Sequence, residues 1–185
     1  METDFFWELI NNSKKYGIEQ IEWLTKELIK KTSEEIIQFE IEFRNKLDKS
    51  YTSSLWGAAF VIMGGCSDDG FDYFRSWLIS RGEEIFNQAL MNPEFLVEYL
   101  SEDCLQEDEF APQLEEMLLV ASDAYTYQKT GMFEYNHDIH TEFINELEVR
   151  GYNFEPIEIE LDWEEEDLEV RYPLLWDRFG ENPLT

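Results

Sequence analysis

The stretch GGCSDDGFDYFR, residues 64–75, gathers the side chains of this sequence that could best do chemistry. Cys66 comes just before a predicted helix start, where the helix dipole could lower the pKa of a thiol. A cysteine nucleophile needs a base, and the two histidines, His137 and His140, lie far along the chain. The carboxylates of Asp68 and Asp69 would raise the pKa of the thiol. We therefore assign no catalytic residue.

Two interpretations of this stretch remain open. In the structural one, Gly64 and Gly65 end one helix, Ser67 caps the next, and Cys66 is a small buried residue. In the other, the stretch belongs to a ligand pocket whose aromatic, acidic and basic side chains would enclose a small molecule. The candidate pocket residues are Trp56, Cys66, Asp68, Asp69, Arg75 and Trp77.

Metal binding has little support from residue spacing. Asp68 and Asp72 share a helix face and could hold Mg²⁺, but two carboxylates identify no site. His137 and His140 have the spacing of a zinc-binding pair without a third ligand at a fixed distance. We predict no metal and no cofactor.

Charge is the strongest compositional signal. The net charge is −28, from 42 acidic and 14 basic residues. Such a chain lacks the basic footprint of a nucleic-acid-binding protein and would be repelled by an anionic membrane. A basic protein partner fits better. The candidate acidic face for such a partner comprises Glu107, Asp108, Glu109, Glu164, Glu165 and Glu166.

The sequence predicts that the elements positioning these residues are helices. Apolar residues recur at helical spacing in residues 18–28, with Ile18 and Leu24 on the inner face, and Thr32 with Glu35 forms a capping box for the next helix. The run SLWGAAFVIM is apolar on all sides, which is typical of a buried helix, and its Gly57, Ala58 and Ala59 would let another helix approach closely. Pro112 marks the expected start of a further long helix.

The C-terminal part is acidic and less regular. FEPIEIELDW alternates apolar and acidic residues, which indicates either a strand or an extended arm lying across the helices. A short helix capped by Asp162 should follow, and the tail should be anchored by Leu174, Leu175, Trp176 and Phe179. We predict a mainly α, irregular single-domain helical bundle over residues 1–185, with an extended or partly helical acidic C-terminal arm.

Four segments together resemble a known family, the bacterial domain of unknown function 4240. They are the FWELI helix at Phe6–Ile10, the WGAAFVIMGGCSDDGFDYFRSWLISRG block at Trp56–Gly82, the Pro-initiated helix at Asn92–Leu96 and the segment Ala121–Gly131. RYPLLW is a weaker echo. The resemblance implies a family-like helical core over residues 1–131, an acidic extension over 132–185 and a cytoplasmic bacterial protein. It implies no activity.

The function that the sequence favours is a non-enzymatic acidic interaction protein that binds a basic partner surface, in the manner of an immunity or inhibitor protein. A DNA-mimic inhibitor is the extreme version. A small-molecule-binding protein or enzyme centred on Asp68, Asp69 and Arg75 is the competing hypothesis. No signal peptide or membrane span is evident, and the two cysteines, Cys66 and Cys104, form no disulfide framework, so we expect a cytoplasmic protein. We assign no small-molecule ligand and expect no direct nucleic-acid or membrane binding.

Overall fold

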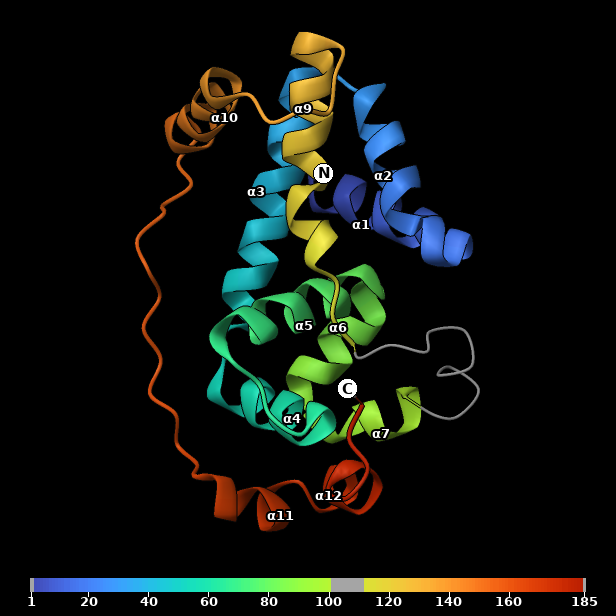
Figure 1. Cartoon of the computed structure of the whole chain (residues 1–185), viewed down its shortest axis with the longest axis vertical. Coiled ribbons are helices and arrows are strands. Elements are labelled where there is room, and N and C mark those ends of the chain that lie inside the picture. Colours follow the sequence, from blue (N-terminus) through green and yellow to red (C-terminus); the bar gives the residue numbers. More distant parts are fainter. Residues whose placement is uncertain (1, 101–111, 185) are drawn as a thin grey trace. The chain divides into compact units, whose positions relative to one another are not determined.

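A computed structural model describes residues 2–100 and 112–184. The described chain is helical and contains no strand, so the predicted mainly α class is confirmed (Figure 1). It divides into two compact units, each built from two stretches of the sequence. Unit 1 comprises residues 1–46 and 116–156, and unit 2 comprises residues 47–115 and 157–185. Whether the two units form the predicted single domain depends on how they join, so the single domain stays a prediction.

The helices of unit 1 are α1 (Glu2–Ser13), α2 (Gln20–Ile29), most of α3 (Ser33–Ser50), α9 (Val120–Thr130) and α10 (His137–Val149), with the short 3₁₀ turns η1 (Lys14–Glu19) and η3 (Glu115–Leu119). The capping box before α3 is confirmed. The Thr32 amide donates to Glu35 Oε2 at 2.8 Å, and the Glu35 amide donates to Thr32 Oγ1 at 3.2 Å.

Apolar faces of these helices meet in the core of unit 1. Phe6 of α1 and Phe39 of α3 are buried with their ring centroids 4.9 Å apart, and Tyr125 of α9 lies 5.2 Å from Phe143 of α10. Leu24 is buried as predicted, but Ile18 is 88% exposed. Ile18 lies in η1, before α2 begins, so the helical spacing that placed it inside does not apply.

Unit 2 begins with the last turn of α3 and continues through α4 (Ser53–Met63), α5 (Asp68–Ser80), α6 (Glu83–Met91), η2 (Pro93–Phe95) and α7 (Leu96–Tyr99). Its second stretch contributes η4 (Glu165–Asp167), α11 (Leu168–Arg171) and α12 (Pro173–Phe179). As predicted, α4 is buried nearly all round. The long helix expected from Pro112 is wrong, because the chain instead forms η3 and reaches α-helical geometry only at Val120.

The C-terminal part matches the predicted arm. Residues 152–164 contain neither helix nor strand, and the short elements η4, α11 and α12 follow them. The cap of the first of these lies two residues later than predicted, since Glu164, not Asp162, is the N-cap of η4. Leu175 and Phe179 are buried and Trp176 is half-buried, whereas Leu174 is 56% exposed and does not anchor the tail.

Candidate functional site

The junction between α4 and α5 has the geometry of two helix caps. Gly64 adopts a left-handed conformation, with φ of 66°, and its amide donates to the Phe60 carbonyl. Ser67 is the N-cap of α5, and its hydroxyl accepts a hydrogen bond from the Gly70 amide at 3.2 Å. These contacts satisfy backbone groups that helix ends leave unpaired. They account for Gly64 and Ser67 without a ligand.

Arg75 is the centre of a buried cluster in unit 2. Only 6% of the residue is exposed. Its Nη1 donates to the Leu47 carbonyl at 2.6 Å, and its Nε donates to the Phe71 carbonyl at 3.3 Å. Its Nη2 forms an ion pair with Asp72. Burial lowers the pKa of the guanidinium, and the Asp72 carboxylate opposes this effect.

Aromatic rings enclose the same guanidinium. Its central carbon lies 4.7 Å from the centroid of the Tyr51 ring and 4.9 Å from that of Phe71. The Phe71 ring in turn stacks on Trp56 at 4.8 Å. Arg75 therefore ties the end of α3 to α5 through hydrogen bonds and cation–π contacts. This engagement favours a structural role for Arg75 over ligand recognition.

Cys66 lies beside this cluster. Trp56 Nε1 donates to the Cys66 carbonyl at 2.9 Å. Burial raises the pKa of the Cys66 thiol to about 12, although the nearby Arg75 cation opposes the rise. Because only a thiolate is an effective nucleophile, this raised pKa disfavours a nucleophilic role for Cys66 near neutral pH.

The six candidate pocket residues divide into three groups. Trp56 and Arg75 belong to the buried cluster just described, whereas Cys66 lies beside it and is half-buried rather than buried as expected. Asp68 and Asp69 are exposed in the first turn of α5. Trp77 packs instead between Phe74, at 5.6 Å, and Tyr99, at 6.1 Å. A ligand pocket formed by all six residues stays a prediction.

Among residues 2–100 and 112–184, no three His, Cys, Asp or Glu side chains come together in a way that could hold a metal ion. Across the same residues, none of the helices has both the length and the apolar content that a membrane crossing requires.

Three of the six residues of the predicted acidic face lie within the described part of the chain. Glu164, Glu165 and Glu166 are exposed, and no cation in the described part of unit 2 forms an ion pair with any of them. The other three residues, Glu107, Asp108 and Glu109, lie outside the described residues.

The three glutamates are held between two buried residues. Trp163 precedes them and Leu168 follows, and both are buried. The Glu164 amide donates to Asp167 Oδ2 at 3.0 Å, and these two residues form the capping box of η4. We call Glu164, Glu165 and Glu166 the acidic triplet. Its backbone is thus positioned by buried anchors and a cap.

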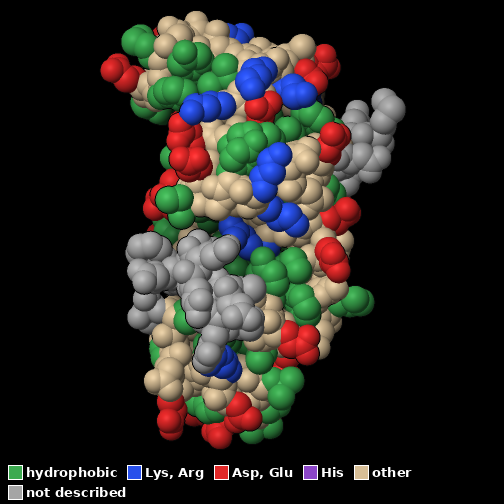
Figure 2. Space-filling model, turned by 90° about the vertical axis from the view of Figure 1, so that its right-hand side faces the viewer, with side chains coloured by type: hydrophobic (Ala, Val, Ile, Leu, Met, Phe, Trp, Pro, Cys, Tyr) green, Lys and Arg blue, Asp and Glu red, His purple; other side chains and the backbone are tan. Residues whose placement is uncertain are grey.

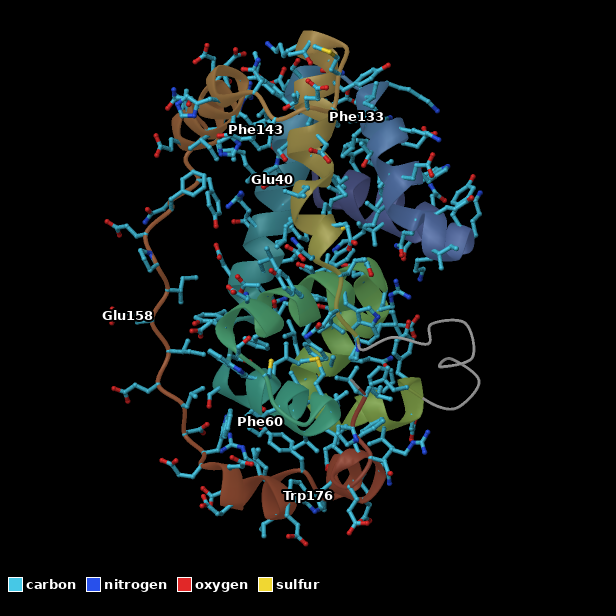
Figure 3. The ribbon with its side chains drawn as sticks, in the orientation of Figure 1. Glu40, Phe60, Phe133, Phe143, Glu158 and Trp176 are labelled. Carbon is cyan, nitrogen blue, oxygen red and sulfur yellow. The ribbon has the colours of Figure 1, made fainter. Side chains whose placement is uncertain are left out.

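Contacts with α4 fix the place of the triplet in unit 2. Trp163 Nε1 donates to the Ser53 carbonyl and Tyr172 Oη donates to the Ser54 carbonyl, both at 2.8 Å. The Trp163 ring also meets the edge of Phe60, which Figure 3 labels on α4, with centroids 5.7 Å apart. A Cβ atom at Gly57 would lie 2.8 Å from Tyr172 Oη and 3.1 Å from Trp163 Nε1. The predicted close approach at Gly57 is confirmed, and the side chains that make it belong to Trp163 and Tyr172, which flank η4 and α11.

Asp162 forms a further anchoring contact with α4, which the residue patterns did not predict. The Asp162 amide donates to Ser53 Oγ at 3.0 Å, the Ser53 hydroxyl donates back to its carboxylate, and Arg171 Nη2 pairs with it at 2.9 Å. The hydrogen bonds from Ser53 and Arg171 lower the pKa of Asp162. The sequence does show Asp162 nine residues before Arg171, but no local pattern indicates that either residue contacts Ser53.

Comparison with known families identifies the chain. A family model described as "Protein of unknown function (DUF4240)" matches residues 1–127. The chain belongs to this family. The DUF4240 match includes α4, the α4–α5 junction and the Arg75 cluster, whereas the acidic triplet and its anchors follow it in the sequence. Searches of curated proteins and of solved structures found no match. Membership of DUF4240 is thus confirmed, and it brings no activity with it.

Proposed function

We propose that this protein is a non-enzymatic interaction protein whose unit 2 binds a basic surface of a partner protein. The observation that carries the proposal is the acidic triplet, three exposed carboxylates without an ion-pair partner in the described part of unit 2, fixed between the buried residues Trp163 and Leu168. Ordered charges lose less entropy on binding than charges on a mobile tail. Complementary charge also speeds association.

The charge of the chain is concentrated in the same unit. By sequence, unit 2 contains 24 acidic and 5 basic residues, whereas unit 1 contains 18 acidic and 9 basic residues. Of the basic residues of unit 2, Arg75 and Arg171 are already engaged with Asp72 and Asp162. Unit 2 therefore has a large excess of negative charge available to a partner.

Apolar side chains accompany these acids and would supply affinity. Val170 and Leu174 are exposed on α11 and α12. Figure 2 shows hydrophobic and acidic side chains next to one another at its lower end, where these helices lie. Interfaces usually combine an apolar centre with a polar rim. We propose a partner that carries Lys or Arg around an apolar patch, and an immunity-like or inhibitor-like role toward it in the cytoplasm of a bacterium.

Capture of partners at two salt concentrations tests this function. The full chain is immobilised and exposed to native bacterial lysate in 50 mM salt, and bound proteins are eluted in 500 mM salt. We expect a basic protein to be eluted, because exposed charge pairs are screened at high salt. A triple variant with Glu164, Glu165 and Glu166 changed to Gln should lose it.

A matched variant controls for total charge. Glu8, Glu134 and Glu148 are exposed residues of unit 1, and changing all three to Gln removes the same charge. This control should still capture the basic protein. Equal loss from both triple variants would show that diffuse charge, rather than the acidic triplet, attracts the partner. Capture of nucleic-acid enzymes whose activity is then blocked would support the DNA-mimic version of the proposal.

A further inference from the structure

Residues 157–161 have backbone groups that no hydrogen bond in the described chain uses. The hydrogen bonds of the described residues reach Glu155 on one side and Asp162 on the other, and none involves the residues between them. Ile157 and Leu161 are each 46% exposed, and Glu158 is exposed, with its side chain pointing away from the path of the chain in Figure 3. An unpaired row of amides and carbonyls is a template for strand pairing.

The side chains of this segment alternate as they do in strands. Ile157, Ile159 and Leu161 occupy every second position, and Glu158 and Glu160 lie between them. An extended chain places such residues on opposite faces. Ile is favoured in strands because its branched side chain packs well on a pleated surface. The preceding Pro156 disfavours a helix at residue 155 and directs the chain into extended geometry.

Fixed contacts flank the segment on both sides. In unit 2, Asp162 and Trp163 bond to Ser53, as described above. In unit 1, the Arg44 guanidinium lies 5.1 Å from the centroid of the Phe154 ring. Because Leu161 directly precedes the anchored Asp162 of unit 2, ordering this segment costs less than ordering a free tail.

We propose that residues 157–161 add as a strand to an exposed sheet edge of the basic partner. This inference rests on the proposed function and names the partner as a β-edge with Lys or Arg at alternate positions. Main-chain hydrogen bonds would give affinity and alternate side chains would give specificity, as in other cases of strand addition. A second copy of this chain fits poorly, because Glu158 and Glu160 would then face like charges across the strands.

A synthetic peptide serves as the probe. The peptide is KVKVKVK with blocked ends, and the control is the same peptide with every backbone amide methylated, which keeps its charge, removes its backbone hydrogen-bond donors and sterically blocks strand pairing. Amide hydrogen exchange of the full chain is measured by mass spectrometry in 50 mM salt. We expect at least tenfold slower exchange over residues 157–161 with the first peptide and no slowing with the methylated one.

Two variants make the result specific to strand pairing. Ile159→Pro removes an amide and should abolish the protection, whereas Ile159→Val should retain it. Slow exchange in the free protein, or protection that persists in Ile159→Pro, would overturn the inference. Equal binding of both peptides without protection would overturn strand addition while leaving the acidic interaction function intact. Failure of both peptides to bind in 50 mM salt would instead count against the proposed function, and strand addition would fall with it.

Discussion

Replacing Gly57 by Ala tests whether the C-terminal segment is seated on α4. The new Cβ would lie 2.8 Å from Tyr172 Oη, 2.9 Å from Tyr172 Cε2 and 3.1 Å from Trp163 Nε1. Overpacking of this kind costs about 1–3 kcal/mol. Displacing the two side chains also weakens two hydrogen bonds to α4, each with a net contribution of about 0.5–1.5 kcal/mol.

Helix propensity acts in the opposite direction. Ala is more favourable than Gly in a helix interior by about 1 kcal/mol. Destabilisation should therefore dominate, and we expect the free energy of unfolding of Gly57→Ala to fall by about 1–5 kcal/mol. Urea unfolding followed by tryptophan fluorescence measures it. Faster tryptic cleavage after Arg171 in the folded state would accompany the displacement.

The matched control is Gly70→Ala in the first turn of α5. A Cβ there would meet only side-chain atoms, Ser67 Oγ at 3.3 Å and Gln113 Nε2 at 3.4 Å. Its stability should be unchanged or raised by up to about 1 kcal/mol. If Gly57→Ala behaved in the same way as this control, Trp163 and Tyr172 would not be packed against α4, and the ordered acidic triplet would lose its support.

Three further predictions concern the Arg75 cluster and unit 1. Cys66, studied in a Cys104→Ser background, should react with iodoacetamide at pH 8 about a thousandfold more slowly than an ordinary exposed thiol, because a pKa of about 12 leaves very little thiolate. A rate near that of free cysteine would contradict this raised pKa. Arg75→Lys should lower the free energy of unfolding by about 2 kcal/mol, since lysine cannot keep the bonds to both the Leu47 and Phe71 carbonyls, whereas loss of partner binding at unchanged stability would indicate a ligand site. Glu40, labelled in Figure 3, is buried, and burial raises its pKa, although Arg44 opposes the rise. The Glu40 carboxyl therefore stays protonated to higher pH in the folded state than in the unfolded state. Its contribution to the free energy of unfolding falls as pH rises from about 4. In urea titrations, the stability of Glu40→Gln relative to the wild type should increase between pH 4 and 7, and a stability difference that does not change with pH would refute this. The control is Glu42→Gln, which removes a charge from the ion pair with Lys46 on the same helix.

Local signals in the sequence predicted much of the fold. Ser67 and Gly64 were expected at helix ends, and both cap helices, because capping depends on residues within a few positions. The buried character of α4 followed from its composition alone. Ile18 was placed wrongly because helical spacing does not show where a 3₁₀ turn replaces the helix.

The candidate site depended more on distant contacts, which residue patterns do not contain. Arg75 looked like a ligand-binding cation, but its guanidinium donates to the Leu47 carbonyl, 28 residues earlier. Gly57 was expected to face another helix, and its neighbours are Trp163 and Tyr172, more than 100 residues later. The sequence shows the run of glutamates at 164–166, but it does not show that Trp163 and Leu168 are buried in unit 2 and hold this run in place.

Affinity for the captured basic partner, measured by titration calorimetry as a function of salt, tests the central claim most directly. Three screened charge pairs at about 0.5–1 kcal/mol each predict that the Gln variant of Glu164, Glu165 and Glu166 binds about 10- to 100-fold more weakly than the wild type in 50 mM salt. The difference should nearly vanish in 500 mM salt, and the triple variant of Glu8, Glu134 and Glu148 should stay within about twofold of the wild type throughout. Equal affinities of the wild type and the triplet variant in 50 mM salt would contradict the claim that the acidic triplet of unit 2 binds a cationic partner.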